Sequence, residues 1–204
     1  DDVESRGLGD VYKRQYLSNS RFIYCSVGGN VKIISKSNIW RFDLLMVLVL
    51  LGTQNNSFHR LLEKIEDCIK NNKIKEEVIV QAGYTKFQSD YMKVFDLIPK
   101  SELEQLQDKA NIIITHGGVG SIVSSIKKEK KVIAIPRLHK YGEHVNDHQT
   151  EIVNMFGKKE YIINCNEVDQ LDEALEKVKH FKPKKYESGT NKIINICLLY
   201  TSPS

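Results

Sequence analysis

Several features that define specialised protein classes are scarce or absent in this sequence of 204 residues. Its four cysteines lie far apart and form no Cys-x-x-Cys pair, which argues against a disulfide framework and a zinc site. Its longest apolar run, residues 44–51, is too short for a membrane-spanning helix, which needs about 20 residues. The net charge of +4 is too small to indicate a nucleic-acid partner. These absences favour a globular domain in a reducing, cytoplasmic compartment.

The two ends of the chain differ from the sequence between them. Residues 1–15 show neither helical nor strand periodicity, and residues 197–204 interrupt a developing helical pattern. Both strings are typical of translated sequencing-adapter sequence, so we expect them to be non-native. Within an N-terminal extension at 16–45, two apolar stretches around Gly-Gly-Asn predict a hairpin. The main domain is expected at 46–196, with Met46 as a candidate natural start.

From Met46 onward, apolar strands alternate with amphipathic helices. Continuous apolar runs predict strands at 46–52, 77–83, 93–98, 111–118, 131–136 and 161–165. Helices are predicted at 58–70, 121–128, 146–156 and 168–178, and another is capped by Ser101 with Glu104 in capping-box position. This alternation indicates an α/β domain, a Rossmann-like parallel sheet with helices on both faces. In such a fold the ligand binds at the carboxyl ends of the strands.

Three of the predicted strands end in glycine-containing loops. The loops are Gly52-Thr53-Gln54, the segment around Gly83, and His116-Gly117-Gly118-Val119-Gly120-Ser121, which opens a helix. Glycine lets the backbone approach a ligand closely, and a helix N-terminus offers free amides to a phosphate. The last loop is neither a Walker loop nor a nucleophile elbow. Each loop alone is also typical of an ordinary tight turn, but three at one sheet edge favour a ligand cleft.

A polar stretch follows the predicted strand that ends at Pro136. Residues 137–149 carry a dense set of hydrogen-bonding side chains, which a sugar ligand requires once water is expelled. A solvated, charged loop is the alternative interpretation. His144 and His148 lie four residues apart beside Asp147, but no third ligand has a firm spacing, so we expect no metal site.

Two smaller groups of residues have simpler interpretations. Lys127, Lys128, Lys130 and Lys131 fit either a solvated helix end or a surface that faces anionic lipid. Cys68 and Cys165 are expected to be small core residues, because no base is visible beside either.

Four segments together resemble a known family. They are 46–62, 78–85, 114–126 and 132–152, and they resemble the glycosyltransferase family 28 C-terminal domain. The small free-standing members are the most similar: the exopolysaccharide or capsule glycosyltransferase subunit of bacteria, and the soluble subunit of the dolichol-type N-acetylglucosaminyltransferase. The resemblance covers about residues 46–196, and PRLHKYGEHVNDHQ is its most specific part.

This resemblance implies the C-terminal, donor-binding half of a GT-B enzyme that is divided over two chains. Such an enzyme transfers a hexose (galactose, glucose or N-acetylglucosamine) from a UDP-sugar, with inversion, to a lipid-diphosphate-linked saccharide, and it needs no cofactor. The implied partner is a membrane-anchored, acceptor-binding subunit that recruits this chain to the inner face of the membrane. The alternatives are a self-sufficient nucleotide-sugar enzyme, such as an epimerase or hydrolase, and a non-catalytic nucleotide-sugar-binding module.

The resemblance also implies roles for individual residues. Gly52, Thr53 and Gln54 match a loop near the donor diphosphate, and Leu97 and Ile98 match the segment that flanks the uracil. His116, Gly117, Gly118, Gly120 and Ser121 match a second phosphate loop, and Glu143, Asp147, His148 and Gln149 match the stretch that faces the donor sugar. Ser124 stands where many members carry a ribose-binding glutamate. His116 is the candidate catalytic base of this chain, and the partner is the other possible source of that base.

Overall fold

The computed structural model of the chain describes residues 22–27, 30–35 and 45–186. The two segments that we expect to be non-native, 1–15 and 197–204, lie outside the described residues.

The chain divides into two compact units, with the boundary between residues 43 and 44. In the first unit, β1 (Phe22–Val27) and β2 (Asn30–Ser35) pair antiparallel, with Phe22 opposite Ser35 and Val27 opposite Asn30. This is the pairing of a hairpin.

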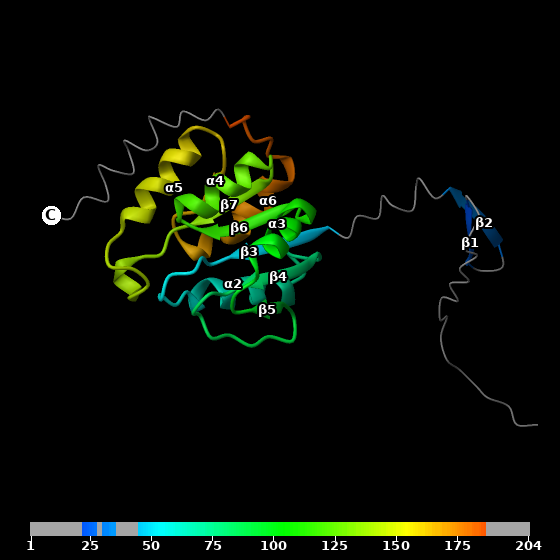
Figure 1. Ribbon diagram of the computed structural model, residues 1–204. Helices are drawn as coiled ribbons and strands as arrows, with labels where there is room; N and C mark the ends of the chain where they lie inside the picture. Colours follow the sequence, from blue (N-terminus) through cyan, green and yellow to red (C-terminus); the bar gives the residue numbers. More distant parts are fainter. Residues whose placement is uncertain (1–21, 28–29, 36–44, 187–204) are drawn as a thin grey trace, which may run out of the picture. The chain divides into compact units, whose positions relative to one another are not determined.

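The second unit contains a six-stranded parallel sheet (Figure 1). Its strands are β3 (Met46–Leu50), β4 (Glu77–Gln81), β5 (Lys93–Phe95), β6 (Ile112–His116), β7 (Lys131–Ile135) and β8 (Ile163–Asn164). Their order is β5-β4-β3-β6-β7-β8, and each neighbouring pair is parallel. Every strand lies within its predicted range and is shorter, because the loop residues at the ends leave the ladder.

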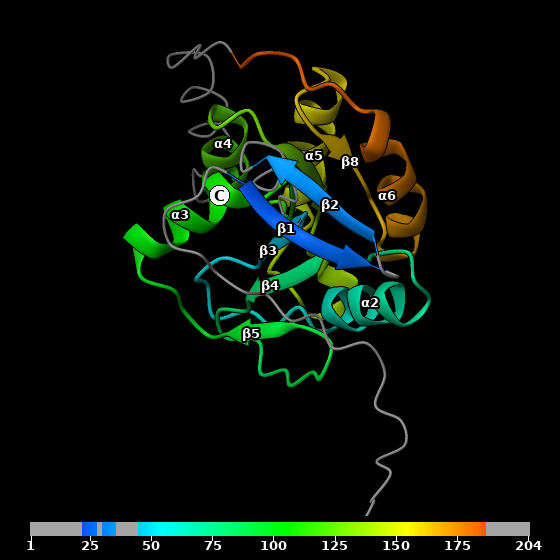
Figure 2. The ribbon, with the colours of Figure 1, turned by 90° about the vertical axis from the view of Figure 1, so that its right-hand side faces the viewer.

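Helices cover both faces of this sheet, as predicted. They are α2 (His59–Lys70), α3 (Lys100–Lys109), α4 (Val119–Lys127), α5 (His148–Lys158) and α6 (Leu171–His180), with short 3₁₀ helices η1 (His139–Tyr141) and η2 (Val168–Gln170). Side chains alternate along a strand, so Val47 and Val49 pack with α2 and α6, whereas Leu48 and Leu50 pack with α4 and α5. Figure 2 shows α2 and α6 on one side of the sheet and α3 and α4 on the other. Within the described residues, no helix is long and apolar enough to cross a bilayer.

The predicted capping box at Ser101 and Glu104 is wrong. The helix begins at Lys100, and Pro99 is its N-cap residue, with the Pro99 carbonyl accepting the amide of Leu103. Proline suits this position because it has no amide hydrogen to satisfy and its φ is fixed. A capping box forms instead between Glu167 and Gln170, at the start of η2.

The strand order creates a topological switch point between β3 and β6. From β3 the chain continues to β4 and β5 on one side, and it then crosses back to β6, β7 and β8 on the other. Connections that leave in opposite directions open a crevice at the carboxyl ends of the two central strands. Leu50 pairs with Thr115 at these ends, so the loops that follow β3 and β6 meet there.

Candidate functional site

His116 lies between two glycines at the switch point. A Cβ atom added to Gly52 would lie 2.6 Å from His116 Cε1, and one added to Gly118 would lie 2.3 Å from His116 Nε2. Gly52 also has a φ of 75°, which L-residues with a side chain rarely adopt. The first and third glycine loops therefore contact each other through the imidazole, and a side chain at either position would force the imidazole to shift.

The second glycine loop joins the other two at the same edge, as the sequence predicts. A Cβ atom on Gly83 would lie 2.3 Å from the carbonyl oxygen of Gly52. Nearby, the hydroxyl of Thr85 accepts the amide of Phe58, which fixes the end of the first loop at the start of α2. The three loops thus form one layer over the carboxyl ends of β3, β4 and β6.

The environment of His116 keeps its imidazole neutral. Nδ1 lies 3.2 Å from the carbonyl oxygen of Leu50, which can only accept, so Nδ1 carries the hydrogen and Nε2 the lone pair. Burial, together with the nearby charge of Arg137, lowers the pKa of His116 to about 4. At neutral pH the ring therefore offers Nε2 as a hydrogen-bond or proton acceptor.

Gln149 connects the third glycine loop to the polar stretch. Its Oε1 atom accepts the amide of Gly117 at 3.1 Å and the amide of Arg137 at 3.0 Å. A Cβ atom on Gly117 would lie 2.6 Å from the Cβ of Gln149, so this glycine allows the close approach of α5. The family resemblance implies that Gln149 faces the donor sugar; in this structure its carbonyl oxygen accepts two backbone amides.

Glu143 forms an ion pair with Arg60 of α2. Its two oxygens accept hydrogen bonds from Arg60 Nε at 3.0 Å and Nη2 at 2.9 Å, and one of them also accepts the amide of Leu138. The Arg60 guanidinium stacks 4.1 Å from the centre of the Tyr141 ring and also contacts Glu167. This network fixes the shape of the loop that contains η1.

The remaining predicted sugar-facing residues lie at the start of α5. Asp147 is exposed, and its Oδ1 accepts the amide of His139 at 2.7 Å. His148 is half-buried, and its amide contacts the side chain of Asn146. Among the described residues, no group of three His, Cys, Asp or Glu side chains is placed to hold a metal ion.

The first turn of α4 is open to a ligand. Gly118 is the N-cap residue of α4, and no side chain caps the helix. Nothing lies within 4 Å of a Cβ atom built on Gly120, so open space adjoins this turn. The Ser121 carbonyl accepts the hydroxyl groups of Ser124 and Ser125. The hydroxyl of Ser124, at the position of the family glutamate, also accepts a hydrogen bond from Gln107.

The residues matched to the diphosphate and the uracil differ in exposure. Thr53 and Gln54 are exposed, so their polar groups are available to a ligand. Leu97 is 57% exposed, whereas Ile98 is buried. The exposed side chain of Leu97 is therefore available to a ligand, whereas that of Ile98 is not.

Two arginines near these loops were not predicted as site residues. Arg60 gives no sequence signal, because its partner Glu143 lies 83 positions away. Arg137 does give a sequence signal. It directly follows an apolar strand and a proline, so a charged side chain stands next to residues that are expected to be buried. Its side chain is only 1% exposed.

The two smaller groups also have defined places. Lys128 and Lys130 donate to Asp108 at the end of α3, and Lys131 donates to the last carbonyls of α6. These lysines therefore complement helix C-termini within the fold. Cys68 and Cys165 are free, buried members of one core cluster, as predicted. Burial raises the pKa of each thiol to about 12.

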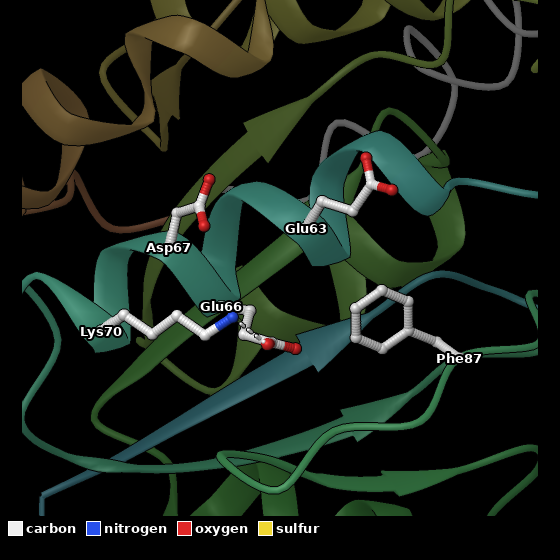
Figure 3. Close-up of a pocket in the computed structure, with 5 residues that line it drawn as sticks. All are labelled: Glu63, Glu66, Asp67, Lys70 and Phe87. Atoms are coloured by element: carbon white, nitrogen blue, oxygen red, sulfur yellow. Dashed lines mark ion pairs between the residues drawn. The ribbon is translucent and has the colours of Figure 1, made fainter.

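A pocket on α2 is separate from the glycine loops (Figure 3). Its lining consists of Glu63, Glu66, Asp67, Lys70 and Phe87, and Glu66 pairs with Lys70 at 2.5 Å. None of the predicted site residues lines it. Its three carboxylates make it a poor site for a phosphorylated ligand.

Comparisons with known proteins identify the family of the second unit. The sequence model of the glycosyltransferase family 28 C-terminal domain matches residues 46–196, whereas no curated protein sequence matches the chain. In fold, the chain is similar to the glycotransferase of kitacinnamycin, with a TM-score of 0.50 and 16% identity over 67% of this chain and 35% of that chain. It is also similar to ALG13, with a TM-score of 0.50 and 18% identity over 77% of this chain and 96% of that chain.

The chain thus spans about a third of the kitacinnamycin glycotransferase. Its Rossmann-like sheet corresponds to the C-terminal half of a GT-B glycosyltransferase, as the resemblance implied. The family match covers well over half of the chain, and the chain therefore belongs to the glycosyltransferase family 28 C-terminal domain family.

Proposed function

We propose that this chain is the donor-binding catalytic subunit of an inverting, UDP-sugar-dependent hexosyltransferase. The meeting of the Gly52 and His116 loops at the switch point, beside the open first turn of α4, carries this proposal. Backbone amides and a helix N-terminus at such a crevice suit the diphosphate of a nucleotide-sugar. Exposed Thr53 and Gln54 and the exposed side chain of Leu97 extend the same edge toward the nucleoside.

The proposed chemistry uses these groups without a metal or cofactor. Departure of UDP from the sugar builds negative charge on the diphosphate, which amides and a helix N-terminus stabilise. Inversion requires a base that accepts the proton of the acceptor hydroxyl. His116 Nε2 carries a lone pair at neutral pH, but a pKa of about 4 makes it a weak base. A base from the partner subunit is therefore the alternative source.

The proposed acceptor is a lipid-diphosphate-linked saccharide in polysaccharide biosynthesis. A GT-B active site lies between two Rossmann-like halves, and residues 46–196 supply one of them. We infer that a membrane-anchored partner binds the acceptor and brings this cytoplasmic chain to the inner face of the membrane. The ordered stretch around Glu143 and Asp147 then faces the donor sugar between the halves.

Thermal unfolding of the 204-residue chain with UDP, GDP or ADP tests the donor assignment. A ligand at about 100 times its dissociation constant stabilises a protein by about 2.7 kcal/mol, which is visible as a rise in melting temperature. We expect a rise with UDP that exceeds the rises with GDP and ADP. Equal rises, or none, would contradict a uridine site. Turnover of a UDP-sugar by this chain alone would favour the self-sufficient enzyme instead.

A further inference from the structure

Arg137 lies beneath the first glycine loop. Its Nη2 atom donates to the carbonyl oxygen of Leu51 at 2.7 Å, and Leu51 immediately precedes Gly52. The guanidinium carbon lies 5.7 Å from the centre of the Phe58 ring, at the start of α2. Arg137 therefore supports the loop that connects β3 to α2 from the side opposite to solvent.

The guanidinium is incompletely paired. Its Nε and Nη1 atoms are buried and have no hydrogen-bond partner in the structure. Among the described residues no carboxylate forms a direct ion pair with Arg137. Glu143 is bound by Arg60 and acts on Arg137 only through its nearby charge, which does not outweigh burial: the pKa of Arg137 is lowered. The charge of Arg137 also acts on His116, whose pKa it helps to lower.

Such a group is costly to keep in a folded protein. A buried charge without a directly bound counter-ion is unfavourable, and buried N–H groups without partners are rare. The same low-polarity surroundings strengthen its attraction to an anion placed nearby. A guanidinium is also the side chain best suited to phosphate oxygens. The charge of Arg137 is thus expected to be balanced, across the loop, by an anion bound over the glycine loop.

Resting on the proposed donor site, we propose that Arg137 is a positioning residue whose counter-charge is the diphosphate of the bound donor. It holds the Leu51 carbonyl and so the adjacent loop, and the diphosphate over that loop balances its charge. The site then recognises a diphosphate more strongly than a nucleoside, and the cost of the unpaired charge in the empty site is recovered on binding.

The test compares three ligands on the full chain and its variants. UDP, uridine and inorganic pyrophosphate are titrated by calorimetry into the wild type, Arg137→Met, Arg137→Lys and Lys177→Met. Lys177 is an exposed lysine of α6. Its variant removes one positive charge, as Arg137→Met does, but from another element of the fold. Melting of each unliganded variant is recorded as well.

We expect Arg137→Met to lower the affinities for UDP and pyrophosphate at least about tenfold, whereas the affinity for uridine changes by less than about twofold. Its unliganded melting temperature is retained or rises, because relief of the buried charge offsets the lost bond to Leu51. Arg137→Lys keeps most of the preference for UDP over uridine, and Lys177→Met matches the wild type. Equal loss of UDP and uridine, or an Arg137→Met variant that melts lower or fails to fold, would make Arg137 a structural residue and overturn the inference.

The wild-type titrations separate this inference from the proposed function. If the chain binds pyrophosphate as tightly as UDP, the uridine assignment fails. The role of Arg137 is then decided by comparing the pyrophosphate affinities of the wild type and Arg137→Met. If the chain binds UDP and Arg137→Met binds it equally well, only the role of Arg137 fails. If the chain binds neither UDP nor pyrophosphate, the proposed donor site and the role of Arg137 are both wrong.

Discussion

Arg60 and Glu143 form a two-pronged ion pair that joins α2 to the polar stretch after β7, with N–O distances of 3.0 and 2.9 Å. The side chain of Glu143 is only 7% exposed. A buried pair of this geometry fixes the position of two segments that lie far apart in the sequence. It gives α2 a direct influence on the loop that we place beside the donor sugar.

Replacing Arg60 with leucine should therefore affect both stability and binding. The substitution leaves the Glu143 carboxylate buried without its main partner, which lowers the free energy of unfolding by about 2 kcal/mol or more. The loop loses its fixed shape, so the affinity for a UDP-sugar falls more than the affinity for UDP. Denaturant unfolding and calorimetry measure the two effects.

Lys177→Ala provides the control for this change. Lys177 and Glu173 form an exposed ion pair on α6, and such pairs contribute only about 0–1 kcal/mol. An Arg60→Leu variant that behaves like Lys177→Ala would show that the pair does not order the loop.

Gly52→Ala should destabilise the fold, whereas Gly120→Ala should not. An alanine at position 52 must adopt a positive φ, and its methyl group clashes with His116. Together these lower the free energy of unfolding by about 1–3 kcal/mol. Gly120 lies inside α4 with open space around it, so alanine there is neutral or stabilises by about 0.5–1 kcal/mol. Chemical denaturation compares the two variants.

Gly120→Ala also tests the phosphate loop itself. If a diphosphate approaches the first turn of α4 closely, the added methyl group weakens UDP binding even though the fold is intact. An unchanged dissociation constant for UDP would place the ligand away from Gly120.

The stability of the chain should fall between pH 7 and pH 5, and His116 should cause part of that fall. The pKa of His116 is about 4 in the folded chain and 6.5 as a free side chain, so the unfolded chain binds the proton first as the pH falls. Between these pH values the group removes about 2 kcal/mol of stability. Unfolding of the wild type and His116→Asn at both pH values measures the difference, and parallel losses in the two proteins would contradict it.

Binding of UDP should raise the pKa of His116. A diphosphate beside the ring favours the imidazolium form and also balances the charge of Arg137, which lowers that pKa in the free chain. NMR titration of the imidazole with and without UDP provides the measurement. A ring that titrates identically in both samples would place the diphosphate elsewhere.

Cys68 and Cys165 should resist alkylation in the folded chain. Both thiols are buried, and burial raises the pKa of each to about 12, so little thiolate forms at pH 8. Iodoacetamide followed by peptide mapping should label them in denaturant and leave them unlabelled in buffer. Rapid labelling of either residue in buffer would mean that the local core opens.

The fold could be predicted because its signals are local. An unbroken apolar run such as that at Met46–Leu50 identifies a buried parallel strand, and glycines mark where the strands end. The contacts within the site could not be predicted in the same way. Glu143 looked available to a sugar because its partner Arg60 is distant in the sequence, and Gln149 looked free because the two amides that it binds come from separate loops. A dense set of polar residues indicates hydrogen bonding, but it does not distinguish bonds to a ligand from bonds within the loop.

One oxygen atom of Gln149 holds the backbone of two loops, at Gly117 and at Arg137. Because the acceptor is shared, a displacement of either loop pulls on the other through α5. The loop after β6 and the loop after β7 are thus mechanically coupled through a single acceptor atom.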